Sequence, residues 1–174
     1  MTTVGKVVMG MMGRLRPRPA TGEARPVIDL PAASRHGGMP LMDALAARRS
    51  SRSFAPDPLP PAVLSDLLWA AYGVNREDGG RTAPSAINAQ EVDIYVAMAQ
   101  GAYRYDAAHH RLHLEAAADI RRVTGYQDFV DDAALALVYV ADHSRMHLVP
   151  ASQREAYAYV ATGAITQNVY LYAA

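Results

Sequence analysis

The spacing of apolar residues predicts two helices in the first half of the chain. Apolar side chains recur at helical spacing over residues 41–49, so we expect a helix there. Pro61 suits the first turn of a second helix, and Gly73 suits its C-terminal cap. The apolar stripe of this second helix comprises Val63, Leu64, Leu67, Leu68 and Ala71.

Alternation of apolar and other residues, with a period of two, predicts strands in the middle of the chain. Apolar residues alternate with others over residues 92–98, which indicates a strand. Residues 103–105 and 111–114 flank a turn around 107–110, so we expect a hairpin there. The continuous apolar run at 134–141 has the length of a buried strand.

The order of the elements indicates a fold class. We expect a short helix at residues 116–123, and Pro150 opens the longest helical candidate, which runs to the last residue. Helices and short strands are therefore interleaved. That order favours an α+β or α/β sandwich in which helices cover a sheet. The length of 174 residues is typical of one domain, and about half of the residues are apolar, which is enough for a sizeable core.

The first 38 residues show no sustained periodicity and are rich in proline, glycine and arginine. We interpret them as an extended or partly disordered arm, with order beginning at Pro40 and a folded domain over residues 39–174. Lys6, the apolar residues 7–12 and the arginines after them resemble a shortened signal peptide, but no small-residue cleavage site follows. We therefore predict a cytoplasmic protein with a flexible leader, and export is the alternative.

Charge and composition exclude several classes of function. The 17 basic and 17 acidic residues give a net charge of zero, so nothing global attracts the chain to nucleic acid or to an anionic membrane. No apolar run reaches the roughly 18 residues of a membrane-spanning helix. The absence of cysteine excludes disulfides and thiolate catalysis. His109, His110 and His113 scatter in direction across a turn, so we expect no metal site.

The densest polar cluster follows the first predicted helix and reads R-R-S-S-R-S-F at residues 48–54. Arg48 and Arg52 are four positions apart and share a face if the helix persists. Two guanidinium groups and a serine hydroxyl can hold a doubly charged phosphate. The alternative is that these arginines complement the helix dipole and are solvated.

The polar stretch at residues 75–90 is long for a connector, and its second part reads R-T-A-P-S-A-I-N-A-Q. Small residues there let the backbone approach a planar ligand. Pro84 and Ser85 can open a helical turn whose amides face an anion or a carbonyl oxygen. Asn88 and Gln90 each donate and accept hydrogen bonds, as the edge of a heterocycle requires. The alternative is an ordinary loop.

Taken together, these segments resemble the nitroreductase-like family of flavin mononucleotide (FMN) proteins. The pattern is R-R-S-x-R-x-F, a helix containing L-L-W-A-A-Y-G, then R-T-A-P-S-A-x-N-x-Q and a strand. G-A-Y-R-Y-D at residues 101–106 resembles the family's hairpin, and residues 163–174 resemble its long central helix. The resemblance covers residues 41–174. It implies an α+β sandwich with a mostly antiparallel sheet flanked by helices, and a long central helix at a dimer interface.

The resemblance assigns one group of residues to the phosphate and ribityl part of FMN. These residues are Arg48, Arg49, Ser50 and Arg52. It also places the amide of Gln127, within the segment G-Y-Q-D-F, at the pyrimidine edge of the flavin. The alternative for Gln127 is a loop residue that faces solvent.

A second group closes over the isoalloxazine ring on the same resemblance, namely Pro84, Ser85 and Asn88. In this family that loop usually comes from the partner subunit, so a homodimer is implied. The last predicted helix carries a stripe of mostly small residues that lets another helix approach closely. The stripe consists of Ala156, Val160, Gly163 and Gln167. The alternative is that this stripe packs within its own subunit.

The activity that the resemblance implies is FMN-dependent oxidoreduction. NADH or NADPH passes hydride to the flavin, and a small organic acceptor such as a nitroaromatic or a quinone is then reduced. The sequence shows no nucleophile–base constellation, so we expect the flavin to carry the chemistry without a catalytic side chain. The alternative is a non-catalytic flavin-binding or dimerisation protein derived from the same family.

The chain departs from the family pattern at two places. The branch that oxidises azoline rings has a Lys-Tyr pair just after A-P-S, whereas residues 88–92 here read N-A-Q-E-V, so we do not expect azoline oxidation. Family members continue past the central helix with a further strand and a basic phosphate contact. We therefore expect the flavin-binding domain at 39–174 to be C-terminally incomplete.

Overall fold

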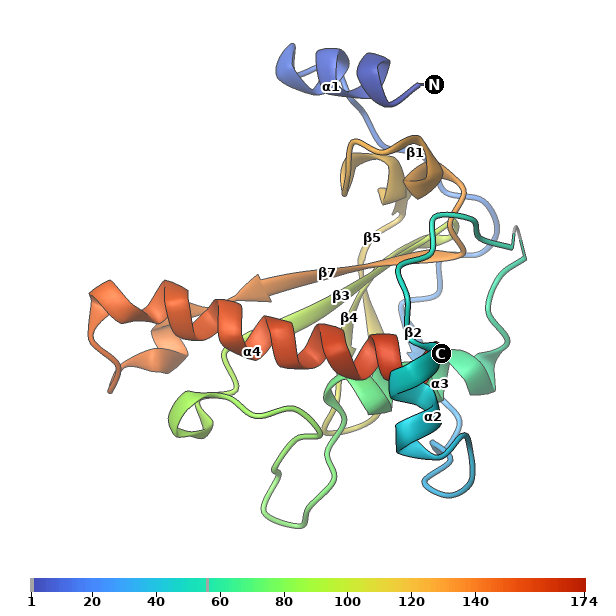
Figure 1. Cartoon of the computed structure of the whole chain (residues 1–174). Coiled ribbons are helices and arrows are strands. Elements are labelled where there is room, and N and C mark those ends of the chain that lie inside the picture. The colour runs from blue at the N-terminus through green and yellow to red at the C-terminus, as the bar shows by residue number, and fades with distance from the viewer. Residues whose placement is uncertain (1, 56) are drawn as a thin grey trace.

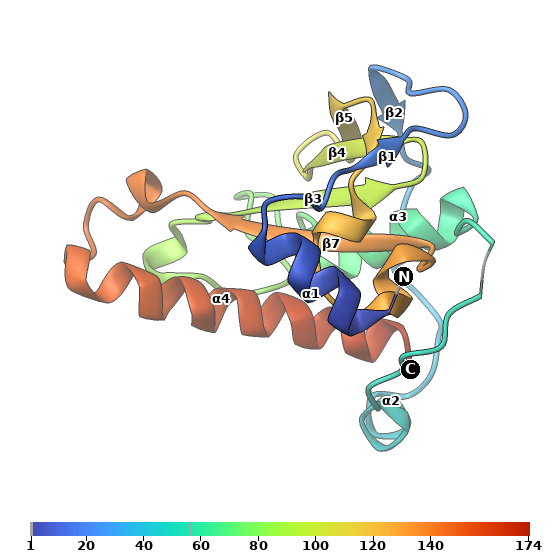
Figure 2. The ribbon, with the colours of Figure 1, turned by 90° about the horizontal axis from the view of Figure 1, so that it is seen from above.

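The computed structural model of the chain describes residues 2–55 and 57–174. Helices and an antiparallel sheet make up an α+β fold, which confirms the class expected from the sequence (Figure 1). A second view, from above, shows the longest helix lying alongside the strands (Figure 2). This arrangement leaves one long side of that helix free of the sheet.

The main sheet has five antiparallel strands in the order β2-β5-β4-β3-β7. The strands are β2 (Val27–Asp29), β3 (Val92–Met98), β4 (Gly101–Asp106), β5 (Arg111–Ala116) and β7 (Leu135–Ala141). The predicted strands and the predicted hairpin are thereby confirmed as elements, but the buried position expected for the strand at 134–141 is wrong, because β7 is an edge strand without a fully buried residue. β2 and β7 lie at the two edges of the sheet.

The helices that follow the N-terminal arm are α2 (Leu41–Ala47), α3 (Pro61–Tyr72) and α4 (Ala151–Tyr172), which confirms the second and the last predicted helix. α3 begins at a proline whose fixed φ suits the first turn. It ends at Gly73, where a Cβ would collide with the ring of Trp69. No helix within the described residues has the length and hydrophobicity that a membrane span requires.

The core lies between one face of the sheet and the helices α3 and α4. Leu68 of α3 and Ile165 of α4 belong to one buried cluster with Val96 of β3 and Tyr103 of β4. Successive side chains of a strand point to opposite faces, so one face of the sheet faces this cluster. The packing fixes α4 along β3 and β7, as both ribbon views show (Figures 1 and 2).

The short helix predicted at residues 116–123 is wrong. The segment contains β6 (Ala118–Asp119), which pairs with β1 (Arg18–Pro19), and then a single 3-10 turn, η2 (Arg121–Val123). Asp119 is buried and accepts hydrogen bonds from the backbone N–H and the guanidinium of the residue two positions later. Such local bonds compete with a helix. The other 3-10 turns are η1 (Ala86–Asn88), η3 (Asp128–Asp131) and η4 (His143–Met146).

The N-terminal arm contains regular elements that the sequence did not predict. α1 (Thr3–Met11) is a helix, and β2 joins the main sheet through β5. The reason is a distant contact, because Lys6 is fully buried with its Nζ 2.6 Å from Asp131 Oδ1 and 2.9 Å from Gln127 O. Local periodicity cannot register such a partner. The domain boundary at residue 38 stays a prediction.

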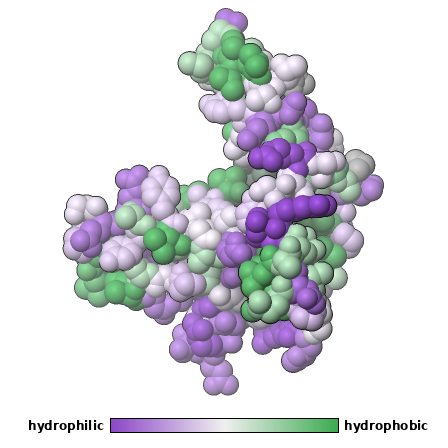
Figure 3. Space-filling view, viewed as in Figure 1, coloured by the Kyte–Doolittle hydropathy of each residue, from purple (hydrophilic) through white to green (hydrophobic). Residues whose placement is uncertain are grey.

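The two sides of α1 differ in character. The inner side carries Lys6, and Gly10 lets the helix approach Tyr126 because a Cβ there would collide with the ring. On the outer side Val4 and Met11 are exposed, and Figure 3 shows an apolar patch at the top of the molecule, where α1 lies. The polar contacts of Lys6 therefore contribute to holding α1 on the body of the protein, and no apolar side chain of α1 is fully buried.

The turn between β4 and β5 is tied to α3 through His110. The imidazole Nε2 lies 2.7 Å from Oγ of Ser65, and that hydroxyl donates to Pro31 O at 2.6 Å. The hydroxyl of Tyr105 lies 2.9 Å from Nδ1. Because the serine has a single proton, His110 donates from Nε2, and Nδ1 accepts from the tyrosine. Burial lowers the pKa of His110, which favours this neutral form.

Candidate cofactor site

A cavity of about 720 Å³ lies between the segment after α2, the region of η3 and the C-terminal end of α4. The first segment contributes Arg49, Ser50 and Arg52, and the second contributes Gln127 and Phe129. Ligand pockets commonly have volumes of about 300–1,000 Å³. Four residues assigned to FMN by resemblance, from segments distant in sequence, therefore line one cavity of suitable size.

The arginines of this cavity are available to an anion. Arg49 and Arg52 are exposed, and neither has a hydrogen bond or ion pair with another described residue. Arg48 lies outside the cavity lining, with its guanidinium 5.7 Å from the ring centroid of Tyr170. α2 ends at Ala47, and Arg48 is extended with ψ 123°. The helix does not persist to Arg52, so the condition under which Arg48 and Arg52 would share a helical face is not met.

Gln127 stands in the opposite wall of the cavity, on the segment that α1 holds. Its side chain is exposed and lines the cavity, while its carbonyl oxygen accepts from Lys6 Nζ at 2.9 Å. Phe129 follows and packs against Phe54, with ring centroids 5.7 Å apart. This aromatic pair joins the two walls. Sequence reasoning missed both phenylalanines and Lys6, since no local pattern marks a contact between distant segments.

The loop containing Pro84, Ser85 and Asn88 does not line this cavity. Its backbone is strained, because Ile87 and Asn88 have φ of 51° and 55°. The left-handed region is uncommon outside glycine and is a genuine outlier for a β-branched residue such as isoleucine. Ser85 Oγ accepts from the backbone N–H of Gln90 at 2.9 Å, which helps to hold this conformation. Strain of this kind clusters at ligand sites.

A network of side chains supports the strained loop from behind. Arg81 Nε donates to Gln90 Oε1 at 2.9 Å, and Gln90 Nε2 donates to Asn88 Oδ1 at 3.2 Å. The guanidinium of Arg81 also lies 5.2 Å from the ring centroid of Tyr72. Burial, and next the charge of Glu91, raise the pKa of Tyr72. Glu91 is fully buried, and its carboxylate oxygens have no hydrogen-bond partner among the described residues, a feature that sequence reasoning also missed.

Within one chain, the loop and the arginine segment approach α4 from different sides. Asn168 Nδ2 donates to Thr82 O at 3.3 Å, whereas Tyr170 lies under Arg48. Residues two positions apart on a helix point in nearly opposite directions. The structure therefore brings Arg49, Ser50 and Arg52 together with Gln127. It does not bring Arg48 or the loop of Pro84, Ser85 and Asn88 into the same cavity lining.

The side of α4 that faces away from the sheet is open. Val160 is 69% exposed, and Ala156 and Gln167 are exposed on the same stripe. A Cβ added at Gly163 would meet no atom within 4 Å. The stripe predicted from the sequence thus points outward, and the alternative of packing within its own subunit does not hold.

Comparison with known proteins identifies the family. The sequence pattern described as the Nitroreductase family matches residues 45–174. A protein of Methanocaldococcus jannaschii described as a candidate nitroreductase is 33% identical over 143 residues, which cover 76% of this chain and 72% of that protein. The chain belongs to the Nitroreductase family, and this membership indicates a flavin-dependent oxidoreductase.

Solved structures agree with this assignment. The crystal structure of a candidate nitroreductase from Ralstonia eutropha JMP134 is similar with a TM-score of 0.86 and 53% identity, covering 91% of this chain and 76% of that chain. The Escherichia coli microcin synthetase McbBCD complex contains a chain with a TM-score of 0.60 at 16% identity, covering 98% of this chain and 77% of that one. The second likeness concerns the fold alone.

Proposed function

We propose that the protein is an FMN-dependent oxidoreductase that passes hydride from NADH or NADPH to a small organic acceptor such as a nitroaromatic or a quinone. The observation that carries this proposal is the shared cavity of Arg49, Ser50, Arg52 and Gln127. Family membership supports the flavin chemistry in general. The geometry supports FMN in particular, because one end of the cavity is cationic and the other offers an amide and aromatic rings.

The cationic end suits the phosphate of FMN. Arg49 and Arg52 have no carboxylate partner among the described residues, so their donors are free for phosphate oxygens. Guanidinium groups bind phosphate through paired, charge-assisted hydrogen bonds. The Ser50 hydroxyl supplies a further donor on the same segment. Arg48 would act through its contact with Tyr170, fixing where this segment meets α4.

The opposite wall suits the flavin ring. The carboxamide of Gln127 can donate to and accept from the pyrimidine edge. Phe54 and Phe129 offer apolar surface to an aromatic ligand. We place the flavin-binding domain at residues 39–174. α1 lies outside that range, but its Lys6 donates a hydrogen bond to the backbone carbonyl of Gln127.

The second layer of the site would come from another copy of the chain. Pro84, Ser85 and Asn88 sit on a strained loop away from the cavity, and the open stripe on α4 can receive a second helix. A homodimer would bring this loop of one copy over the cavity of the other. The loop would then shield the ring from water and fix its face.

The chemistry requires few titrating side chains. When bound, the flavin supplies the hydride-accepting and hydride-donating centre. The residues of this chain bind the phosphate, orient the ring and exclude water. No catalytic side chain is assigned.

The test is the visible absorbance of the purified protein with FMN, without oxygen, before and after addition of NADH or NADPH. Flavin bands that stay with the protein on gel filtration and bleach with the nicotinamide support the proposal. Flavin that is retained but not bleached by either nicotinamide supports the non-catalytic flavin-binding alternative. An Arg49→Ala/Arg52→Ala variant that retains FMN as well as the wild type contradicts the assigned phosphate site.

A further inference from the structure

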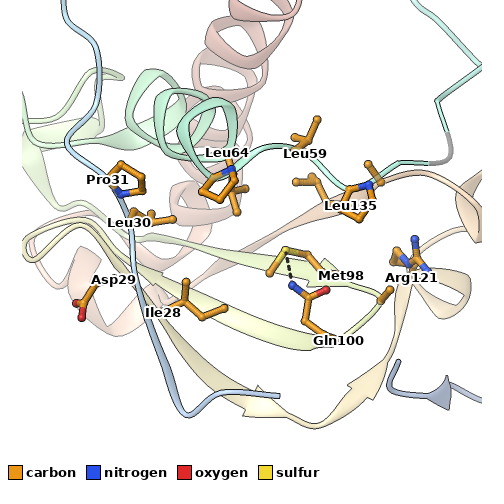
Figure 4. Close-up of a pocket in the computed structure, with 14 residues that line it drawn as sticks. Ile28, Asp29, Leu30, Pro31, Leu59, Leu64, Met98, Gln100, Arg121 and Leu135 are labelled. Carbon is orange, nitrogen blue, oxygen red and sulfur yellow. Dashed lines mark hydrogen bonds between the residues drawn. The ribbon is translucent and has the colours of Figure 1, made fainter. Parts of the chain in front are cut away.

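A second cavity, of about 250 Å³, is lined in part by Pro58 and Leu59, which follow the arginine cluster in the chain, and Figure 4 shows the side chains around it. It is bounded by β2, the first turn of α3, the turn between β3 and β4, and the start of β7. None of the residues assigned to FMN lines it. What the cavity binds can therefore be argued independently of the proposed function.

The walls of this cavity are aliphatic. Six large apolar side chains line it, from β2, α3, β3, β7 and the segments beside β2 and α3, and they belong to the main core or pack against it. They are Ile28, Leu30, Leu59, Leu64, Met98 and Leu135. Prolines 31, 58 and 61 also contribute to the lining, and proline fixes φ in the segments that carry it. The cavity is thus held open by backbone that loses little freedom when a ligand binds.

The charged groups at the rim already have partners. Arg121 Nη2 lies 2.8 Å from Asp119 Oδ2, and its Nη1 donates to Ala133 O at 2.6 Å. Asp29 Oδ1 lies 3.5 Å from Arg111 Nε, and Asp29 is itself largely exposed. Among the described residues that line the cavity, no cation is therefore left without an opposite charge, and burial of an unpaired ligand charge there would be unfavourable.

One polar group remains available at the rim. The carboxamide of Gln100 has the thioether sulfur of Met98 as its hydrogen-bond acceptor, at 3.7 Å, and both side chains are drawn in Figure 4. A thioether is a weak acceptor. The amide oxygen and the second N–H of Gln100 can therefore serve a ligand that carries one hydroxyl or carbonyl group.

The volume sets the size of the ligand. An apolar cavity of about 150 Å³ stays dry and binds benzene. The cavity here is larger, at about 250 Å³, and its aliphatic walls offer a water molecule few of the polar partners it needs. We propose that this cavity is a binding site for a neutral aromatic molecule of one or two rings that carries a single hydroxyl or carbonyl group, which Gln100 recognises.

The primary experiment is a calorimetric titration with 2-naphthol at saturating FMN. The expected result is one site whose affinity falls at least tenfold in a Leu59→Trp variant, because the indole would occupy the cavity. A Leu148→Trp variant adds the same ring at a residue that is 74% exposed and lies outside the cavity, and it should bind like the wild type. Equal affinity in the two variants would overturn the proposal.

Two matched comparisons test the chemistry of recognition. Gln100→Leu should weaken 2-naphthol about fivefold, as loss of one neutral hydrogen bond does, and leave naphthalene unchanged. The anion 2-naphthoate should bind at least tenfold more weakly than 2-naphthol, since no free cation awaits it. Tighter binding of the anion, or competition between 2-naphthol and FMN, would refute this site. Failure of FMN to bind would refute the proposed function. The titration with 2-naphthol would then be made without FMN, and it would still test the cavity.

Discussion

Replacing Lys6 by methionine is expected to release α1 from the body of the protein. The amine is fully buried, 2.6 Å from Asp131 Oδ1, and it also donates to Gln127 O at 2.9 Å. Methionine keeps much of the apolar stem but removes the charge and the donors. The Asp131 side chain is only 5% exposed, and among the described residues the cation left within ion-pair distance of its carboxylate would be Arg18, at 3.3 Å.

The free-energy cost of the Lys6→Met substitution follows from the burial of the ion pair between Lys6 and Asp131. Removing one partner of a buried ion pair costs about 3–5 kcal/mol. Arg18 remains beside the carboxylate, so the lower end, about 3 kcal/mol, applies here. Since about 1.4 kcal/mol corresponds to a factor of ten, the population with α1 detached should rise roughly a hundredfold.

Hydrogen exchange measured by mass spectrometry on the α1 peptide reads this population directly. Exchange should accelerate roughly a hundredfold in Lys6→Met and change at most about twofold in Arg14→Met, an exposed residue of the same arm. The double variant Lys6→Met/Asp131→Leu should regain most of the protection, because replacing both partners of a buried pair is often nearly neutral. Unchanged exchange in the single variant would refute the reasoning.

Three further predictions address the site, the surface and the pH response. Arg49→Ala and Arg52→Ala should each weaken FMN binding about tenfold or more in a fluorescence titration, since a hydrogen bond to a charged group contributes about 1.5–3 kcal/mol, whereas Arg16→Ala, remote from the cavity, should not. Val160→Glu should convert a dimer to a monomer in sedimentation velocity, whereas the exposed Val123→Glu should not. The folded-state pKa of His110 is lowered from 6.5, first by burial, so the unfolded state binds the extra proton. The contribution of neutral His110 to the free energy of unfolding is therefore present above about pH 6.5 and is lost as pH falls below it. His110→Asn, which tolerates the positive φ of 52°, should remove this part of the pH dependence in urea unfolding.

Local signals in the sequence were sufficient for the elements that carry a long, regular pattern. The alternation in β3, the apolar run of β7 and the proline before α4 each mark an element without help from distant residues. The end of α2 was different. Arginine favours helices, but Arg48 turns extended and packs against Tyr170, a partner that no short window contains. Tertiary contact overrode propensity there.

The same limit explains what the sequence could not show about the site. Resemblance indicated which residues bind FMN, and that assignment stays a prediction. It did not indicate that the backbone carbonyl of Gln127 accepts a hydrogen bond from Lys6. The N-terminal segment is rich in proline, glycine and arginine, and nothing in that composition predicts a buried amine. The strained backbone at Ile87 was equally invisible, since isoleucine is among the residues least expected to adopt a positive φ.

The placement of the two predicted halves of the site connects flavin binding to self-association. Within one chain, the arginine segment and the loop of Pro84 and Asn88 meet α4 on different sides, so a single copy cannot close over its own cavity. If a second copy supplies the loop, FMN binds the dimer more tightly than the monomer, and FMN must then strengthen dimerisation by the same factor. Val160→Glu would therefore weaken FMN binding although residue 160 lies outside the cavity lining. If FMN binding and dimerisation instead prove independent of each other, each chain binds its flavin without the partner's loop.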